Sequence, residues 1–198
     1  DEGAGVVVAV GHTGCNHAQA LAAVARGARG ATHLFNAMPP IHHRAPGPVL
    51  ALSDSPGVTL EIICDGVHLA APLVRHLFAD RGSRLALITD AMAAAGNPDG
   101  EYLLGDLAVE VRDGIARLAG LDTIAGSTLT LDVAVENCVA WGVPLLDVIP
   151  AVTSQPADYL GLDAGRLRPG ARADLTALRA DGTLAGVMAD GSWVREPE

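Results

Sequence analysis

Four short apolar runs recur along the first ninety residues, and a polar turn follows each of them. The runs consist mainly of Val, Ile, Leu and Ala, a composition typical of strands that are covered on both faces. The pattern predicts strands at 6–10, 30–34, 59–64 and 85–89. The segments between the runs have helical spacing, so successive strands and the helix between them form βαβ units. Right-handed crossovers in such units predict a parallel sheet.

Helix signals lie between these runs. Asn16 is a suitable N-cap for a helix that ends at Gly27, where glycine favours termination. A short helix is predicted over 49–52, and a longer one over 72–78.

The pattern changes after the fourth run. Asp113-Gly114 is a hairpin turn signal inside an insertion of short antiparallel strands. Ser127 is the predicted cap of a helix that reaches Trp141, and helical spacing continues to 160 despite Pro150 and Pro156. From Gly165 the pattern turns to β. The short strands are predicted at 102–104, 107–111, 115–118, 174–178, 184–189 and 192–194.

Composition narrows the class of protein. The 198 residues are 49% hydrophobic, which predicts a packed core. We expect the chain to divide into a main domain at 1–163 and a β appendage at 164–198. The formal charge of −10 argues against a nucleic-acid partner. No apolar run approaches the ~20 residues of a membrane span. Three widely spaced cysteines, read as core thiols, fit a reducing cytoplasm.

His12 and His33 follow the first two predicted strands. Neighbouring parallel strands lie ~4.8 Å apart, so two imidazoles at equivalent ends can converge on one metal ion. The alternative is a pair of hydrogen-bonded polar residues without a metal.

Asp90 closes the fourth run. A partly buried carboxylate is expected there, either as a general base beside a metal or as a cap for the next segment.

The remaining candidates lie in two loops. His68 ends the segment DGVH, in which Asp65 can hold the turn through backbone hydrogen bonds. Arg44 is either a solvated side chain or an anion clamp, because guanidinium matches phosphate oxygens. Asn36 and the backbone of Ala37 could add donors to such a clamp.

Taken together, these segments resemble the N-acetylglucosamine-6-phosphate deacetylases of the amidohydrolase superfamily. The resemblance rests on GHT, ATHLFNAM, Arg44 before Pro-Gly, DGVH, TDA, AGSTLT and the tail GRLRPGARADLTAL, in the family's order.

The resemblance implies an α/β fold: about four βα units of a TIM-type barrel, the β-hairpin insertion and a small C-terminal β-sandwich segment. It implies a divalent metal, zinc or iron(II), held by His12 and His33, with Asp90 as the catalytic carboxylate. Asn36, Ala37, Arg44 and His68 would bind the sugar phosphate. The implied reaction is hydrolysis of the acetamide, in which Asp90 takes a proton from water and passes it to the departing amine. In this family the loop arginine can reach a partner subunit's site, so a homodimer is expected.

The chain departs from the family in extent. Such barrels need eight strands and ~250 residues, whereas four units are present here. No residue matches the family's metal-binding glutamate or its upstream histidine. We therefore expect the 198 residues alone to be inactive. Two alternatives stay open: a deacetylase for another N-acetylated sugar phosphate, and a non-catalytic fragment or split-enzyme half that needs a complementary N-terminal chain.

Overall fold

The computed structural model describes residues 5–197, which form two compact units. One unit comprises the residues up to Ile62 together with His76–Leu87 and Leu146–Arg172. The other comprises Ile63–Arg75, Ile88–Leu145 and the residues from Ala173 onward. The boundary at 163/164 that the sequence suggested is not the boundary of these units and stays a prediction about domains.

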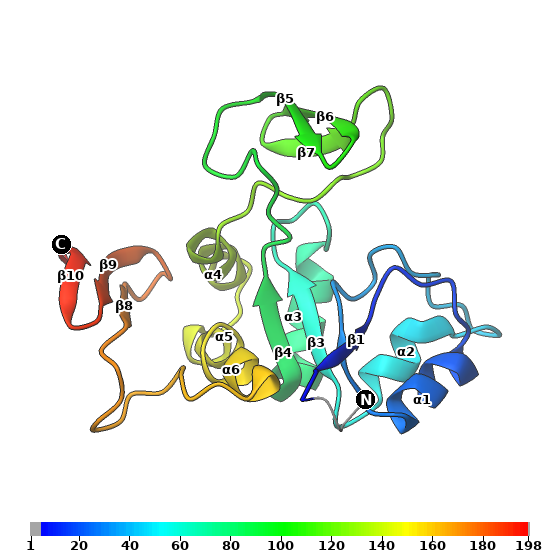
Figure 1. The fold of residues 1–198 in the computed structure, drawn as a ribbon, viewed down its shortest axis with the longest axis horizontal. Helices are drawn as coiled ribbons and strands as arrows, with labels where there is room; N and C mark the ends of the chain where they lie inside the picture. The colour runs from blue at the N-terminus through cyan, green and yellow to red at the C-terminus, as the bar shows by residue number, and fades with distance from the viewer. Residues whose placement is uncertain (1–4, 198) are drawn as a thin grey trace. The chain divides into compact units, whose positions relative to one another are not determined.

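Most residues of a four-stranded parallel sheet belong to the first unit (Figure 1). Its order is β1-β2-β3-β4, so consecutive strands are neighbours, as right-handed βαβ units require. Helix α1 follows β1, α2 follows β2, and α3 follows β3. The α/β class is therefore confirmed. The bounds are β1 Val8–Val10, α1 His17–Ala25, β2 Ala28–Ala31, α2 Gly47–Ser53, β3 Thr59–Ile63, α3 Ala71–Arg81 and β4 Leu85–Ile88.

The core of this unit lies between the sheet and α1 and α2, which lie side by side in Figure 1. Leu60 and Ile62 of β3 are fully buried, and Leu52 of α2 is buried with them. Burial of such side chains is worth about 1.5–3 kcal/mol each. Helices α5 (Leu145–Ala151) and α6 (Ser154–Leu160) belong to the same unit, apart from the first residue of α5.

Strand β1 differs from its prediction. The run Val6–Val10 was expected to be covered on both faces, but Val6 is 63% exposed and Val8 is 39% exposed. The reason is position, since β1 pairs only with β2 in the described part of the chain and forms an edge of the sheet. The second strand also ends earlier than predicted, at Ala31, because the chain turns at Thr32 before it reaches His33.

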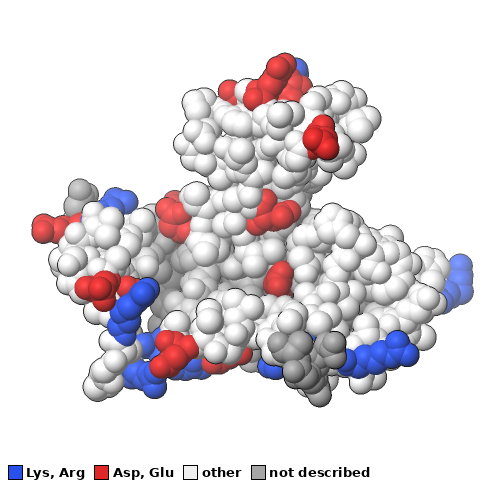
Figure 2. Space-filling view, in the orientation of Figure 1, with Lys and Arg blue, Asp and Glu red and all other residues white. Residues whose placement is uncertain are grey.

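The described residues of the second unit contain two antiparallel sheets, one complete helix and the start of α3. The hairpin insertion is confirmed as β5 (Gly100–Leu104), β6 (Leu107–Arg112) and β7 (Ile115–Leu118). Asp113 and Gly114 turn between β6 and β7 with φ of 52° and 71°, the left-handed pair that a tight hairpin turn needs. Figure 2 shows acidic side chains gathered over this sheet.

Helix α4 (Leu131–Ala140) begins later than predicted. Thr130 occupies its N-cap position, so the assignment of that role to Ser127 is wrong. The Ser127 hydroxyl donates to a carbonyl of another segment instead. The other antiparallel sheet consists of β8 (Leu175–Leu178), β9 (Leu184–Ala189) and β10 (Ser192–Arg195). Its strand order is β10-β9-β8.

The two prolines of the predicted helical stretch 145–160 act as expected. Pro150 lies in the last turn of α5, and Pro156 lies in the first turn of α6, where a missing N–H is tolerated. Among the described residues, no helix is both long and apolar enough to cross a bilayer.

Candidate active site

The two predicted metal ligands and the predicted catalytic carboxylate share an unusual backbone conformation. His12, His33 and Asp90 have φ of 43°, 33° and 50°, the left-handed region that non-glycine residues seldom adopt. Such residues persist only where their surroundings hold them, and they concentrate at functional sites. Each follows a strand of the parallel sheet, so the chain turns sharply at these strand ends.

His12 and His33 form a close pair. Their ring centroids are 4.6 Å apart and the rings meet edge to face, with an interplanar angle of 77°. His33 is only 5% exposed, and its Nδ1 is buried without a hydrogen-bond partner. A buried polar atom with no partner is costly, and a bound cation is one way to satisfy it.

The donor chemistry of this pair fits part of a metal site. Neutral imidazole nitrogens are ligands for zinc and iron(II), and the unpartnered Nδ1 of His33 is such a nitrogen. Within residues 5–197 no group of three or more His, Cys, Asp or Glu side chains could hold an ion. Catalytic zinc sites usually have three protein ligands, and His12 and His33 could supply two of them.

Glu61 and Tyr159 support the His33 turn, and the sequence analysis missed both. The Leu34 amide donates to the Glu61 carbonyl over 2.8 Å, and the Glu61 carboxylate accepts from the Tyr159 hydroxyl and the His33 amide. Burial raises the pKa of Glu61, although these hydrogen bonds oppose it. Burial and the nearby Glu61 carboxylate raise the pKa of Tyr159 to about 12.

Glycine at position 30 makes this arrangement possible. A Cβ there would lie 1.9 Å from the Tyr159 hydroxyl oxygen, so any other residue would displace the tyrosine. In the sequence, the charged Glu61 within the otherwise apolar run TLEII was the feature that could have indicated a buried polar contact.

The loop after His33 is tied to the His12 turn. The Thr13 amide donates to the Ala37 carbonyl over 3.1 Å. The Asn36 side-chain amide donates to the carbonyls of His33 and Leu34, so it braces the turn. This part of the chain therefore holds the two histidines together.

Arg44 lies farther along the same loop and is exposed. Its guanidinium contacts the His43 ring over 2.6 Å, and its amide donates to His42. Both contacts are local, and neither places Arg44 at the histidine pair.

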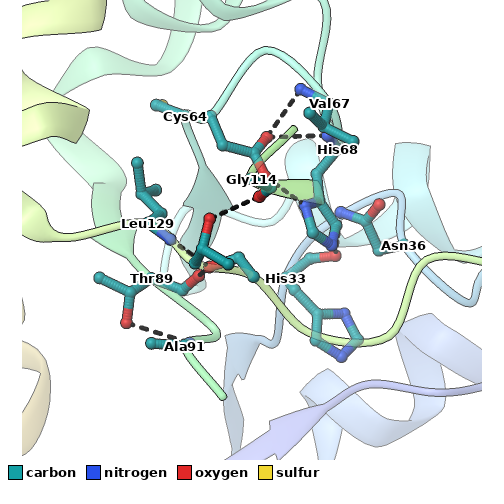
Figure 3. A network of polar contacts seen from close by, with 12 residues as sticks. His33, Asn36, Cys64, Val67, His68, Thr89, Ala91, Gly114 and Leu129 are labelled. Carbon is teal, nitrogen blue, oxygen red and sulfur yellow. Dashed lines mark hydrogen bonds and ion pairs between the residues drawn. The ribbon is translucent and has the colours of Figure 1, made fainter. Parts of the chain in front are cut away.

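His68 is held by Asp65 in the second unit. The His68 Nδ1 and one Asp65 carboxylate oxygen are 2.7 Å apart, while the other oxygen accepts from the amides of Val67 and His68 at 2.8 Å each (Figure 3). Burial alone would raise the pKa of Asp65, but the hydrogen bonds from His68 and the two amides lower it below its ordinary value. The pair fixes the ring and leaves Nε2 of His68 for a ligand.

A cavity of about 280 Å³ adjoins this pair. Asp65 and His68 line it together with Asn137 of α4 and the Gly114 turn. The Asn137 side chain also donates to the Cys64 carbonyl over 2.9 Å, which fastens α4 to the end of β3. The cavity is polar at His68 and apolar at Val133 and Ile115, a combination that suits a small polar molecule.

The cysteines near this cavity behave as core residues. Cys64 and Cys138 are fully buried, and a hydrogen bond with Cys138 together with burial raises the pKa of the Cys64 thiol. Buried thiols behave as small apolar side chains, so the interpretation of both as packing residues is confirmed. Cys15 is partly exposed.

Asp90 is placed differently from its prediction. We expected a partly buried carboxylate, but the residue is exposed because it turns away from the strand in a left-handed conformation. An exposed carboxylate is accessible to water and substrate, which a general base requires.

Comparison with known proteins identifies the family. Residues 1–194 match the amidohydrolase family. The chain belongs to this family.

Relatives that resemble this amidohydrolase chain over most of its length include deacetylases of amino-sugar phosphates. It is 38% identical to the N-acetylglucosamine-6-phosphate deacetylase of Vibrio furnissii over 196 residues, which are 96% of this chain and 47% of that protein. It is 40% identical to the N-acetylgalactosamine-6-phosphate deacetylase of Escherichia coli O157:H7, over 87% of this chain and 46% of that protein.

A solved structure extends the likeness to the fold. It is a mutant of N-acetyl-D-glucosamine-6-phosphate deacetylase from Mycobacterium smegmatis, in complex with N-acetyl-D-glucosamine-6-phosphate. The TM-score is 0.94 at 48% identity, over 98% of this chain and 52% of that one. The amidohydrolase chain therefore spans about half the length of these relatives.

Proposed function

We propose that this chain is the C-terminal half of a metal-dependent deacetylase that converts N-acetylglucosamine 6-phosphate to glucosamine 6-phosphate and acetate. The observation that carries the proposal is the likeness of nearly the whole chain to a solved deacetylase, with a TM-score of 0.94. The paired imidazoles of His12 and His33 support it independently, because amide hydrolysis at neutral pH benefits from a Lewis acid.

His12 and His33 would hold the divalent metal, zinc or iron(II). The metal, when bound, would polarise the acetamide carbonyl as a Lewis acid. The His33 turn is braced by Glu61 and Asn36, so its imidazole is oriented before any ligand arrives. A third ligand would come from sequence outside these 198 residues.

Asp90 would serve as the general base and then as the general acid. Its carboxylate would take a proton from the attacking water and deliver it to the departing nitrogen. An exposed side chain on a fixed turn suits this role, since it meets solvent and substrate from one position.

The sugar phosphate would be bound by His68 and the loop after His33. Asp65 engages Nδ1 of His68, which leaves Nε2 for a substrate oxygen. Arg44, together with Asn36 and the backbone of Ala37, would contact the phosphate. Its exposed guanidinium has His43 rather than a carboxylate as its side-chain contact, and this leaves its charge for an anion.

The architecture that accompanies this proposal is half of a (β/α) barrel, with β8–β10 as part of a small β-sandwich. The sheet supports a half-barrel because its described part has two edges, β1 and β4, where further strands could pair. A complementary N-terminal half would complete the enzyme, and the expected oligomer is a homodimer. We place it in the cytoplasm, in line with its unpaired cysteines.

Two other assignments have specific support. The 40% identity to an N-acetylgalactosamine-6-phosphate deacetylase favours the epimeric substrate as an alternative. The match to about half of each relative supports the second alternative, a split-enzyme half or a non-catalytic fragment.

Acetate release from the two N-acetylated sugar phosphates tests the proposal. The native polypeptide that carries this sequence should be assayed on both substrates under the same conditions, with the unphosphorylated sugars as controls. A higher kcat/KM for the glucosamine derivative supports the proposal, and a higher value for the galactosamine derivative supports the first alternative. Absence of acetate release from either would overturn deacetylation and favour a non-catalytic role.

A further inference from the structure

The Asp90 turn is paired along its main chain with a segment that the proposed mechanism does not use. Ala91 and Ser127 form an isolated parallel bridge outside the named strands. The Ser127 amide donates to the Asp90 carbonyl over 2.8 Å, and the Met92 amide donates to the Ser127 carbonyl over 2.9 Å. The backbone of Ser127 thus binds the turn on both sides of Ala91.

The Ser127 side chain adds a further pair of contacts. Its hydroxyl donates to the Thr89 carbonyl and accepts from the Leu129 amide, and both contacts are drawn as dashed lines in Figure 3. Ser127 is only 4% exposed, so water cannot replace these hydrogen bonds easily. One residue therefore engages the main chain at Thr89, Asp90 and Met92.

The approach between the segments depends on Gly126. A Cβ at this position would lie 3.1 Å from the Asp90 carbonyl oxygen and 3.3 Å from the Met92 Cβ. Its φ of 67° is also in the region that favours glycine. The dipeptide Gly126-Ser127 is thereby fitted to the Asp90 turn in both shape and hydrogen bonding.

The turn needs such support because Asp90 has a φ of 50°. A left-handed aspartate is maintained only where neighbouring contacts over-determine it. Release of these contacts would let the residue relax toward ordinary backbone angles, and the direction of its carboxylate would change with them.

We propose that Ser127 is a positioning residue that holds Asp90 in the orientation required for proton transfer. The proposal rests on the proposed function of Asp90, and it assigns to Ser127 a role distinct from its packing. A displacement of about 1 Å at a catalytic group can cost about a hundredfold in rate. Loss of the Ser127 hydroxyl should therefore lower kcat more than it affects substrate binding.

The first experiment measures the turn itself, by hydrogen exchange of the native polypeptide carrying this sequence. Ser127→Ala should accelerate exchange of the amides of Met92 and Ser127. Ser55→Ala is the matched control, because Ser55 is 7% exposed and its hydroxyl donates to the Ala51 carbonyl over 2.8 Å, in a different segment. Unchanged exchange in 89–92 in Ser127→Ala would overturn the proposal whether or not the protein is a deacetylase.

The second experiment is a double-mutant cycle on acetate release. Ser127→Ala should lower kcat by about ten- to a hundredfold with little change in KM, whereas Ser55→Ala should leave kcat unchanged. In the Asp90→Asn background the same change should have no further effect, because the residue acts through Asp90. If the two losses multiply, Ser127 acts through general stability and the proposal is wrong.

A steric variant covers the case in which Ser127→Ala does not fold. Gly126→Ala retains the Ser127 hydroxyl but pushes on the Asp90 carbonyl, and it should show the same selective loss of kcat. An unaltered kcat in Gly126→Ala would contradict the proposal. If the parent protein releases no acetate, the proposed function fails, while the exchange experiment still decides the contact between Ser127 and the turn.

Discussion

At the scale of single residues, the site combines predictable chemistry with an unpredicted backbone. The types and positions of His12, His33 and Asp90 could be inferred from the sequence, because each follows an apolar run. Their left-handed conformations could not, since histidine and aspartate adopt ordinary angles in most loops. The exposure of Asp90 follows from that conformation, and this is why the expectation of partial burial was wrong.

The residues that contact these side chains and turns could not be predicted from the sequence either. Glu61 contacts the His33 amide across the sheet, and Ser127 contacts the Asp90 turn from 37 positions away in the chain. Contacts of this kind depend on tertiary packing and have no local periodicity to reveal them. Asp65, by contrast, was correctly predicted to hold its loop, because an aspartate commonly bonds the backbone two or three residues on.

One residue-scale prediction concerns acid stability. The pKa of Asp65 is lowered in the folded protein, so its contribution to stability is present above the ordinary value of 3.8 and is lost as the pH falls through the lower native pKa. Asp65→Asn should remove this contribution and cost about 1–3 kcal/mol at neutral pH. Urea unfolding at pH 7 and pH 3 measures this contribution. The difference in the free energy of unfolding between the two pH values should be smaller in the variant than in the parent protein.

The control for this prediction is a surface carboxylate. Asp122 is 98% exposed at its side chain and pairs with Arg117 over 3.0 Å. Asp122→Asn should change stability little at either pH, as exposed ion pairs contribute little. An equal loss of stability in Asp65→Asn and Asp122→Asn would show that the buried pair of Asp65 with His68 contributes no more than an exposed ion pair.

At the scale of elements, hydrophobic periodicity predicted the order of strands and helices but not all of their limits. The alternation of β1, α1, β2, α2, β3, α3 and β4 follows from apolar runs separated by helical spacing. The limits differ where tertiary contacts intervene. Ser127 was assigned to a helix cap from residue type alone, and its hydroxyl is instead engaged by the Asp90 turn. The exposure of β1 reflects the lack of a second neighbouring strand, which no pattern within the run itself encodes.

The N-cap of α1 gives an element-scale prediction. Asn16 accepts from the Gln19 amide over 3.0 Å, and the Gln19 side chain accepts from the Asn16 amide over 2.9 Å, a complete capping box. Asn16→Ala should destabilise the protein by about 1 kcal/mol, because it leaves helix donors without a partner. Thermal unfolding measures the loss.

Gln19→Ala provides the comparison, since it removes only the reciprocal contact and should cost less. Equal stability of Asn16→Ala and the parent protein would contradict the role of the cap. The test matters for the site because α1 starts five residues after His12 and anchors the end of that turn.

At the scale of the whole molecule, the family and the fold class follow from both the sequence and the comparisons. Residues 1–194 match the amidohydrolase family, and 98% of the chain superposes on a solved deacetylase. The same comparisons cover only about half of each relative, in agreement with the four βα units counted from the sequence. The half-barrel, the β-sandwich segment and the oligomeric state stay predictions.

The predicted metal ligands His12 and His33 also bear on the whole molecule. Two histidines alone would form a weak, open metal site, because catalytic zinc sites usually have three protein ligands. For the proposed deacetylase, activity is therefore best measured on the native polypeptide that carries this sequence.

The most direct test of the account is acetate release by the metal-loaded native polypeptide, compared with its Asp90→Asn variant. We expect turnover of N-acetylglucosamine 6-phosphate that is lost when a chelator removes the metal. Asp90→Asn should retain the fold and the bound metal but lose about 10²–10⁴-fold in kcat, the usual contribution of general acid–base catalysis. Near-normal turnover by Asp90→Asn, or turnover that survives removal of the metal, would contradict the proposed function.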